Sequence, residues 1–566
     1  MKALPVQTRR TTYVFVALVG VSLAITALQF IFRRFDDNNL MSWNLVFMAA
    51  EPIRFFLVLA TGLSIAAIVV RFYSPHSSRS LLLFSGCFVT ALCFWGTPEV
   101  QVDASRYFTQ AKYIELFGIQ YFWSEWGRSI SAWTDLPAIP FTYGMIFRIF
   151  GEHRIFIQML NAVCFASTAV VTSLIGKELF DEETGGVAGA LLLGIPYLLI
   201  MTPLMLVDVA TMFFLSLTVY LYIRGVTTGG GWRIVGAGAA GCITALCKYS
   251  AWPMLSILVV ITVVYYFRSA SGLRRRILER SFGMLMIIAL LSGIFIVFNY
   301  DVVAGQIDLL LSFQRPSLGR QAESLLSIFL YQIHPIITIA ALVSLFVALY
   351  KRDLNYVIVA WLWCLMFLFH LRRVRYALPA FPLLALMAAY GLQAVKDQAI
   401  KNMIVAGTLI MSLATGVFAY LPYTKQFSAM NIQQAGGFLS SLDVDTIEVV
   451  VQPEKEYSIN PAVFVPLLDL YADKKIVYNY EAGASTPDED YRQSALRFSW
   501  EYKNPVFYSQ EGTHALGRKA VVLISSSTDP ALPGSLQDKI SEYHQTKTFA
   551  TAFPFFSYQS IVRVVW

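Results

Sequence analysis

The chain has 566 residues, of which 57% are hydrophobic and only 14% are charged, and its mean hydropathy is +0.58. This composition excludes an ordinary soluble domain and is typical of a polytopic α-helical membrane protein. The net charge of +7 does not indicate nucleic-acid binding, because the basic residues cluster between apolar runs, where they orient loops.

About thirteen apolar segments follow one another along the chain, each near the length that crosses a bilayer. The first follows the basic stretch MKALPVQTRR. We interpret it as a retained span, because no small-residue cleavage site ends it. The expected spans are residues 12–32, 55–70, 81–95, 155–175, 187–206, 209–223, 234–246, 252–267, 284–298, 325–350, 357–369, 378–394 and 403–420.

Basic loops such as RGVTTGGGWR and RSASGLRRRILERS fall on one side of the membrane if the N-terminus is cytoplasmic. Residues 96–154 and everything after Leu421 then lie on the opposite, extracytoplasmic side. The stretch HLRRVRY (370–376) breaks this rule. Either one helix is miscounted, or the arginines form an anion site at a helix end, where a guanidinium would bind a lipid phosphate.

The segment 96–154 is too rich in Trp and Tyr to be an ordinary solvated loop. Aromatic residues at this density favour the membrane interface, so we expect short amphipathic helices along the outer leaflet. The stretch PAIPFTYGMIFRIF could instead span the membrane, but it is short, and a span here would move the later basic loops outside.

Polar and charged residues return after residue 422, where DTIEVVV, KKIVYNY and AVVLISS alternate with helix-like segments. This alternation predicts a small extracytoplasmic α/β domain with a mostly parallel sheet. We expect it to shape an acceptor site or to contact partners. The chain thus divides into an N-terminal two-helix extension (1–80), a transmembrane core with the outer loop (81–422) and the α/β domain (423–566).

Several ionisable residues are expected at the outer ends of apolar segments. Asp208 lies among apolar residues in TPLMLVDVATMFF, and Lys248 lies similarly in ITALCKYSAW. Ionisable residues there are tolerated when they face a polar cavity, although Asp208 could instead cap its helix. Because the charges gather on one side and no internal repeat is evident, the pattern favours a transferase with a cavity open to one leaflet over a transporter.

Six segments in order resemble the GT-C glycosyltransferases, specifically the protein O-mannosyltransferase-like and aminoarabinose-transferase (ArnT)-like enzymes. The resemblance covers roughly residues 81–394. It rests on VDASRYFTQAKYIELFG, DLPAIPFTYGMIFRIFG, IFIQMLNAVCFASTAVVTSLIGKELF, MLVDVATMFFLSLTVYLY, GAGAAGCITALCKYSAWPML and RRVRYALPAFPLLALMAAYGL. One departure is Asp135-Leu136-Pro137, where aminoarabinose-type members carry Glu-Lys-Pro; the missing lysine leaves its phosphate contact to Lys248 or to the arginines.

The resemblance implies that Asp103 is the general base, which removes a proton from an acceptor hydroxyl. A carboxylate that is partly shielded by aromatic residues can have its pKa moved toward the working pH. It implies a polyprenyl-phosphate sugar as donor, inversion at the anomeric carbon, and cations that stabilise the leaving phosphate. We expect Asp103 and the arginine cluster to line one cavity. The candidate residues are Asp103 and Asp208 for catalysis, Arg372, Arg373, Arg375, Lys248 and Arg315 for the donor phosphate, and Arg106, Tyr107, Asp135 and Tyr376 for substrate.

No cofactor is expected from the sequence. The cysteines lack metal-ligand spacing, and two scattered acids define no coordination sphere, although a divalent cation at Asp208 or Asp135 stays open. The expected partners are the lipid-linked donor, membrane lipids and a glycan, lipid or protein acceptor, in a cell inner membrane. Two alternatives remain: a transporter of lipid-linked glycans, and an oligosaccharide ligase that uses diphosphate-linked donors.

Overall fold

The computed structural model describes residues 6–36, 40–72, 80–99, 101–315, 323–452, 459–478, 505–508, 518–527, 530, 532, 534–553 and 558–566. Within these ranges, 8 helical stretches are long and apolar enough to cross a membrane. The chain is therefore an integral membrane protein. The long stretches are α1 (Val6–Phe32), α2 (Pro52–Phe72), α6 (Arg154–Leu179), α9 (Asp208–Thr228), α11 (Ala251–Met254) with α12 (Ile257–Arg268), α13 (Ser271–Phe298), α18 (Val374–Ala377) with η6 (Leu378–Ala380) and α19 (Phe381–Leu392), and α20 (Gln398–Thr415) with η7 (Gly416–Tyr420) and α21 (Leu421–Gln426).

The chain folds into two compact units. The helical unit comprises residues 1–96, 160–203 and 207–423, and the C-terminal unit comprises residues 97–159, 204–206 and 424–566. Shorter elements complete the helical unit: η1 (Arg33–Phe35), η2 (Leu40–Ala49), α3 (Ser80–Leu92), α7 (Glu182–Leu191), η3 (Leu192–Gly194), α8 (Pro196–Met201), α10 (Gly231–Cys247), α14 (Tyr300–Leu309), η4 (Leu310–Gln314), η5 (Ser327–Ile333), α16 (Pro335–Lys351) and α17 (Asn355–Leu368).

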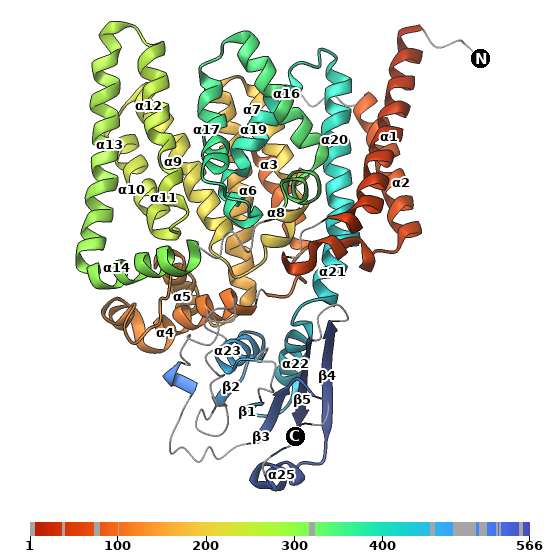
Figure 1. Cartoon of the computed structure of the whole chain (residues 1–566), viewed down its shortest axis with the longest axis vertical. Helices are drawn as coiled ribbons and strands as arrows, with labels where there is room; N and C mark the ends of the chain where they lie inside the picture. The colour runs from red at the N-terminus through yellow and green to blue at the C-terminus, as the bar shows by residue number, and fades with distance from the viewer. Residues whose placement is uncertain are drawn as a thin grey trace. The chain divides into compact units, whose positions relative to one another are not determined.

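Helix α19 forms the core of the helical unit, since every one of its residues is buried. Figure 1 shows α12 and α13 at one edge of the bundle and α1 and α2 at the opposite edge, beside α20. These edge helices expose apolar side chains, such as Phe282 and Leu290 on α13 and Leu57 on α2. Apolar outer faces on helices of this length are suited to contact with lipid.

Two expected spans are interrupted. The segment 187–206 divides into α7, η3 and α8, and α8 begins at Pro196. The segment 325–350 divides at His334, whose extended backbone separates η5 from α16, and α16 begins at Pro335. Both breaks have the same cause, because proline has no N–H to donate within a helix and is favoured at its first turn. The count of thirteen spans stays a prediction.

The C-terminal unit contains a five-stranded sheet in the order β2-β1-β3-β5-β4. Strands β1 (Thr446–Gln452), β2 (Lys475–Tyr478) and β3 (Lys519–Ser525) are parallel, as predicted. The sequence analysis did not anticipate β4 (Thr546–Phe553) and β5 (Tyr558–Val565), which pair antiparallel with each other and through β5 with β3. The sheet is therefore mixed. Its helices are α22 (Met430–Ser441), α23 (Pro461–Tyr471) and α25 (Gly534–Ser541), with the short turn η10 (Val506–Tyr508).

The aromatic segment forms the expected short helices, α4 (Gln101–Glu125) and α5 (Ala138–Phe150), which both belong to the C-terminal unit. Helix α4 bends at Gly118, whose φ of +87° is strained for any residue with a side chain. A Cβ there would also lie 2.9 Å from Nη1 of Arg148 on α5. Placement of these helices along the outer leaflet stays a prediction.

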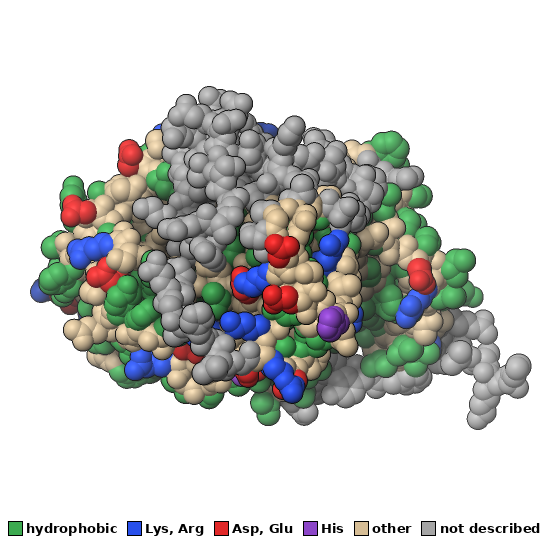
Figure 2. Space-filling model, turned by 90° about the horizontal axis from the view of Figure 1, so that it is seen from below, with side chains coloured by type: hydrophobic (Ala, Val, Ile, Leu, Met, Phe, Trp, Pro, Cys, Tyr) green, Lys and Arg blue, Asp and Glu red, His purple; other side chains and the backbone are tan. Residues whose placement is uncertain are grey.

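Acidic and basic side chains lie beside one another on the face of the molecule shown in Figure 2, rather than in a patch of one sign. Within the C-terminal unit, an exposed ion pair joins Arg518 to Asp443, and a half-buried pair joins Lys539 to Glu448. Exposed pairs of this kind contribute little to stability. They are therefore useful controls for the buried charges described below.

The packing of α19 against α16 yields a prediction about stability. A Cβ added at Gly391 would lie 2.0 Å from the carbonyl oxygen of Ala340, whereas one added at Gly293 on α13 meets nothing within 4 Å. We expect Gly391→Ala to destabilise the protein by about 1–3 kcal/mol through overpacking. Gly293→Ala should be neutral or slightly stabilising. Thermal unfolding of both variants in the same detergent measures the difference, and equal midpoints would contradict this view of the α16–α19 contact.

Candidate functional site

Three charged side chains meet at the first turn of α9 in the helical unit. Asp208 begins this helix and is fully buried. Its Oδ1 lies 2.5 Å from Nζ of Lys248, the residue that follows α10, and its Oδ2 accepts a 2.9 Å hydrogen bond from Nε of Arg375 on α18. A carboxylate is tolerated in this setting because a cation holds each of its oxygens.

Asp208 does not cap its own helix, because the N-cap residue is Val207 and no side chain makes a capping bond there. Tyr376 lies between two cations, with its ring centroid 5.0 Å from Nζ of Lys248 and 5.3 Å from Cζ of Arg373. Cation–π contacts of this kind hold a basic side chain without neutralising it.

The stretch HLRRVRY turns sharply before its arginines. His370 has a φ of +52°, a left-handed conformation that is uncommon for a residue with a side chain and occurs often at functional sites. Arg373 follows with an extended backbone and is half-buried, whereas Arg372 is exposed. The two neighbouring arginines therefore have different surroundings.

Glu323 holds this turn in place and was missed by the sequence analysis. Its backbone N–H donates to the carbonyl oxygen of Arg372 at 2.6 Å, and its carboxylate accepts a hydrogen bond from the backbone N–H of Val374. Glu323 is buried, and it precedes an apolar run. An acid next to an apolar run is the same signal that singled out Asp208, and it could have identified Glu323.

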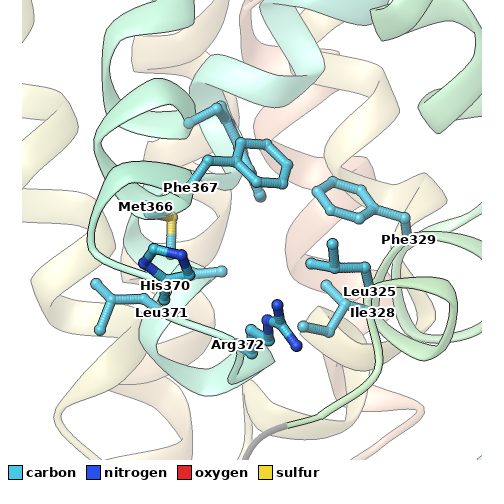
Figure 3. A pocket seen from close by; sticks show the side chains of 10 residues that line it. Leu325, Ile328, Phe329, Met366, Phe367, His370, Leu371 and Arg372 are labelled. Carbon is cyan, nitrogen blue, oxygen red and sulfur yellow. The ribbon is translucent and has the colours of Figure 1, made fainter.

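An apolar cavity of about 220 Å³ lies beside the turn, between η5 and α17. Figure 3 shows the rings of Phe329 and Phe367 at one end and the side chain of Arg372 at the other. Among the described residues, no carboxylate lies within ion-pair distance of the Arg372 guanidinium, which is exposed. The cavity thus combines apolar walls with one cation that has no described counter-ion.

A second group of charged residues lies in the C-terminal unit. Asp103 is in the first turn of α4, and its Oδ1 is 3.6 Å from Nη1 of Arg106, one turn further along. Arg106 also forms a two-pronged contact with Asp135, with 3.0 Å between its Nε and Oδ2 of that residue. Gln110 donates a further 3.0 Å hydrogen bond to Asp135.

The two aspartates of this second group differ in how far their side chains are exposed. The side chain of Asp135 is 4% exposed, whereas that of Asp103 is 23% exposed. Burial alone would lower the pKa of Arg106, but the charges of Asp135 and Asp103 outweigh burial and raise it. The backbone is strained just before Asp135, where Trp133 has a φ of +52°. Tyr107, next to Arg106 on α4, is buried.

The predicted site residues therefore fall into two groups and two outliers. The first group consists of Asp208, Lys248, Arg373, Arg375 and Tyr376, and the second consists of Asp103, Arg106, Tyr107 and Asp135. Arg372 lines the apolar cavity, and Arg315 is exposed at the end of η4. The prediction that Asp103 and the arginines share one cavity stays a prediction. In the described part of the chain, no three His, Cys, Asp or Glu side chains are placed to hold a metal ion.

Residues 135–298 match the family model described as dolichyl-phosphate-mannose-protein mannosyltransferase. A search of curated protein sequences gives no match.

Two solved structures of ArnT from Cupriavidus metallidurans are similar in fold. The structure in the apo state has a TM-score of 0.52, and the structure bound to undecaprenyl phosphate has a TM-score of 0.54. Both are 12% identical to this chain, and each comparison covers 85% of this chain and 97% of the other. These likenesses show that the chain shares the fold of the two ArnT structures, and that its residues 135–298 are similar to the mannosyltransferase family.

Proposed function

We propose that this protein transfers a sugar from a polyprenyl-phosphate donor to a hydroxyl group of an extracytoplasmic acceptor. The observation that carries the proposal is the cavity beside Arg372, because a lipid phosphate needs apolar walls for its chain and a cation for its head. A cavity of about 220 Å³ holds only the part of a long lipid nearest to the phosphate. The related ArnT fold bound to undecaprenyl phosphate supports the same class of ligand.

The cations have different roles in this proposal. Arg372 binds the donor phosphate directly, since its guanidinium has no described counter-ion. Lys248 and Arg375 are held by Asp208, so we assign Asp208 the role of positioning them. With Arg373, they supply the positive charge that stabilises the phosphate as it leaves. Arg315 adds positive charge to the same extracytoplasmic side.

Asp103 is the proposed general base. As an acceptor hydroxyl oxygen attacks the anomeric carbon, its proton passes to the Asp103 carboxylate. The bond between that carbon and the phosphate oxygen breaks, and polyprenyl phosphate leaves with the electron pair. A single displacement of this kind inverts the anomeric configuration. Arg106, Tyr107, Asp135 and Tyr376 are the proposed contacts for the sugar or the acceptor, and a divalent cation at these acids is an untested alternative.

This reaction requires that residues 97–159 and the α/β part, residues 424–566, face the extracytoplasmic side of a cell inner membrane. A lipid-linked glycan transporter would bind the same donor without breaking a bond. An oligosaccharide ligase would prefer a diphosphate-linked donor. Both alternatives are outcomes of the experiments below.

The first test replaces the proposed base. Asp103→Asn keeps the size and shape of the side chain but removes its capacity to accept the proton, so we expect kcat to fall by about 100-fold to 10,000-fold. The measurement is transfer from a polyprenyl-monophosphate sugar by the purified full chain. Asp308→Asn on α14, which changes an exposed aspartate, is the matched control and should retain activity.

Turnover by Asp103→Asn near that of the unmodified protein would remove Asp103 as the base. Donor binding without any product, even for the unmodified protein with a panel of acceptors, would favour a transporter. Product formed only from diphosphate-linked donors would favour a ligase.

The second test concerns the phosphate contact. Arg372→Gln keeps most of the side-chain length but removes the charge, so we expect the Kd for polyprenyl phosphate to rise about tenfold or more. Arg276→Gln on α13 is the control, because Arg276 is also exposed and lies in the basic segment that the sequence analysis expects on the cytoplasmic side. Binding is measured by titration of the detergent-solubilised protein with polyprenyl phosphate. An unchanged Kd for Arg372→Gln would show that the cavity is not the phosphate site.

A further inference from the structure

Lys112 lies at the centre of a buried charge network in the C-terminal unit. It is on α4, the helix that carries Asp103 and Arg106, and its Nζ is 2.5 Å from Oδ2 of Asp469 on α23 and 3.0 Å from Glu152 just after α5. Tyr508 on η10 donates a 2.6 Å hydrogen bond to the same oxygen of Asp469. Asp469 itself is 1% exposed in its side chain. The α/β part therefore binds α4 through a buried ion pair.

A second contact fixes the chain just before α4. The backbone N–H of Glu99 donates a 3.0 Å hydrogen bond to the Tyr471 hydroxyl, at the end of α23. One carboxylate oxygen of Glu99 lies 2.7 Å from Nε of Arg154, and the other accepts a 2.8 Å hydrogen bond from the backbone N–H of Met205. Asp103 lies between Glu99 and Lys112, so α23 holds the base-bearing segment at both ends.

We propose that α23 is a positioning helix for Asp103, acting through Asp469 on Lys112 and through Tyr471 on Glu99. The inference rests on the proposed function of Asp103 as general base. It gives the α/β part a defined task, which is to fix the place of the carboxylate that receives the proton. Asp469 and Tyr471 are positioning residues, since they act through α4 and not on the substrate.

The chemistry of the network favours positioning over simple adhesion. A buried ion pair is often no more stabilising than apolar residues of the same shape, but its geometry is specific. Here one ammonium group is shared by two carboxylates, and burial together with the charge of Asp469 raises the pKa of Glu152. Helix α23 is otherwise apolar, and its residues from Pro461 to Leu470 are all buried. Apolar packing alone would hold α4 without setting its register.

The test uses the full chain and compares Asp469→Asn with Asp443→Asn, which removes a carboxylate from an exposed pair in the same unit. We expect Asp469→Asn to lower kcat about tenfold, because a small displacement of a reacting group reduces turnover strongly. The donor KM should change by less than about twofold, since the proposed phosphate contacts are unaltered. Amide hydrogen exchange in residues 101–112 should be faster in Asp469→Asn only. Lys112→Arg should retain more activity than Lys112→Met.

Faster exchange with an unchanged kcat would overturn the positioning role. If the unmodified protein forms no product, the proposed function fails, and hydrogen exchange alone then decides whether α23 anchors α4. Unchanged exchange in that case overturns the anchor. If Asp469→Asn does not fold, Tyr471→Phe replaces it, because it removes only the hydroxyl that accepts from Glu99. We expect this variant to lower kcat about threefold, and no effect on kcat would contradict the proposal.

Discussion

Asp208 can be buried only because Lys248 and Arg375 hold its two oxygens, and much of the candidate site follows from this interaction. Each partner comes from a different part of the helical unit, so the ion pairs tie α9, the end of α10 and α18 together. Removal of either cation would leave one buried oxygen of Asp208 without its cation, which is more destabilising than loss of an exposed pair. The same interaction limits what these cations can do for a substrate. In the proposed function they stabilise the phosphate by their charge, whereas Arg372, whose guanidinium has no counter-ion among the described residues, is the group assigned to direct contact.

The sequence identified most of these residues but not how they pair. Asp208 was singled out because an acid among apolar residues is tolerated only where it faces a polar cavity. The stretch HLRRVRY was singled out because its arginines are expected on the side where basic loops are rare. Lys248 lies 40 residues from Asp208 along the chain, and Arg375 lies 167 residues from it. No spacing rule connects positions so far apart. Arg106 and Asp135 were both assigned to substrate, whereas in the structure they bind each other. Pairing depends on tertiary contacts, and these are absent from a list of local patterns.

The fold was predicted best where hydrophobic length decides the structure. The spanning stretches of α1 and α2 were located to within a few residues, whereas α13 begins at Ser271, well before its expected start at residue 284. The predictions were weaker where a single residue overrides the average hydropathy of a segment, as Pro196 and Pro335 do when they divide expected spans. They also missed β4 and β5, since TKTFATAF and YQSIVRVV carry charged and polar residues that obscure a strand pattern. Antiparallel strands commonly have one solvated face, so their sequences are less apolar than those of parallel strands, and β4 is also an edge strand.

The three candidate aspartates show how surroundings assign different roles to one side chain. Asp208 is fully buried between two cations, and Asp135 is 4% exposed and bound by Arg106 and Gln110, so both have their oxygens occupied. Asp103 differs, because its side chain is 23% exposed and its contact with Arg106 is a looser 3.6 Å. A proton acceptor must be accessible to its donor, and Asp103 is the most exposed of the three side chains. Carboxyl groups with distinct environments commonly divide catalytic work. In the proposed function, this greater exposure favours Asp103 as the proton acceptor, while Lys248 and Arg375, held by Asp208, stabilise the departing phosphate.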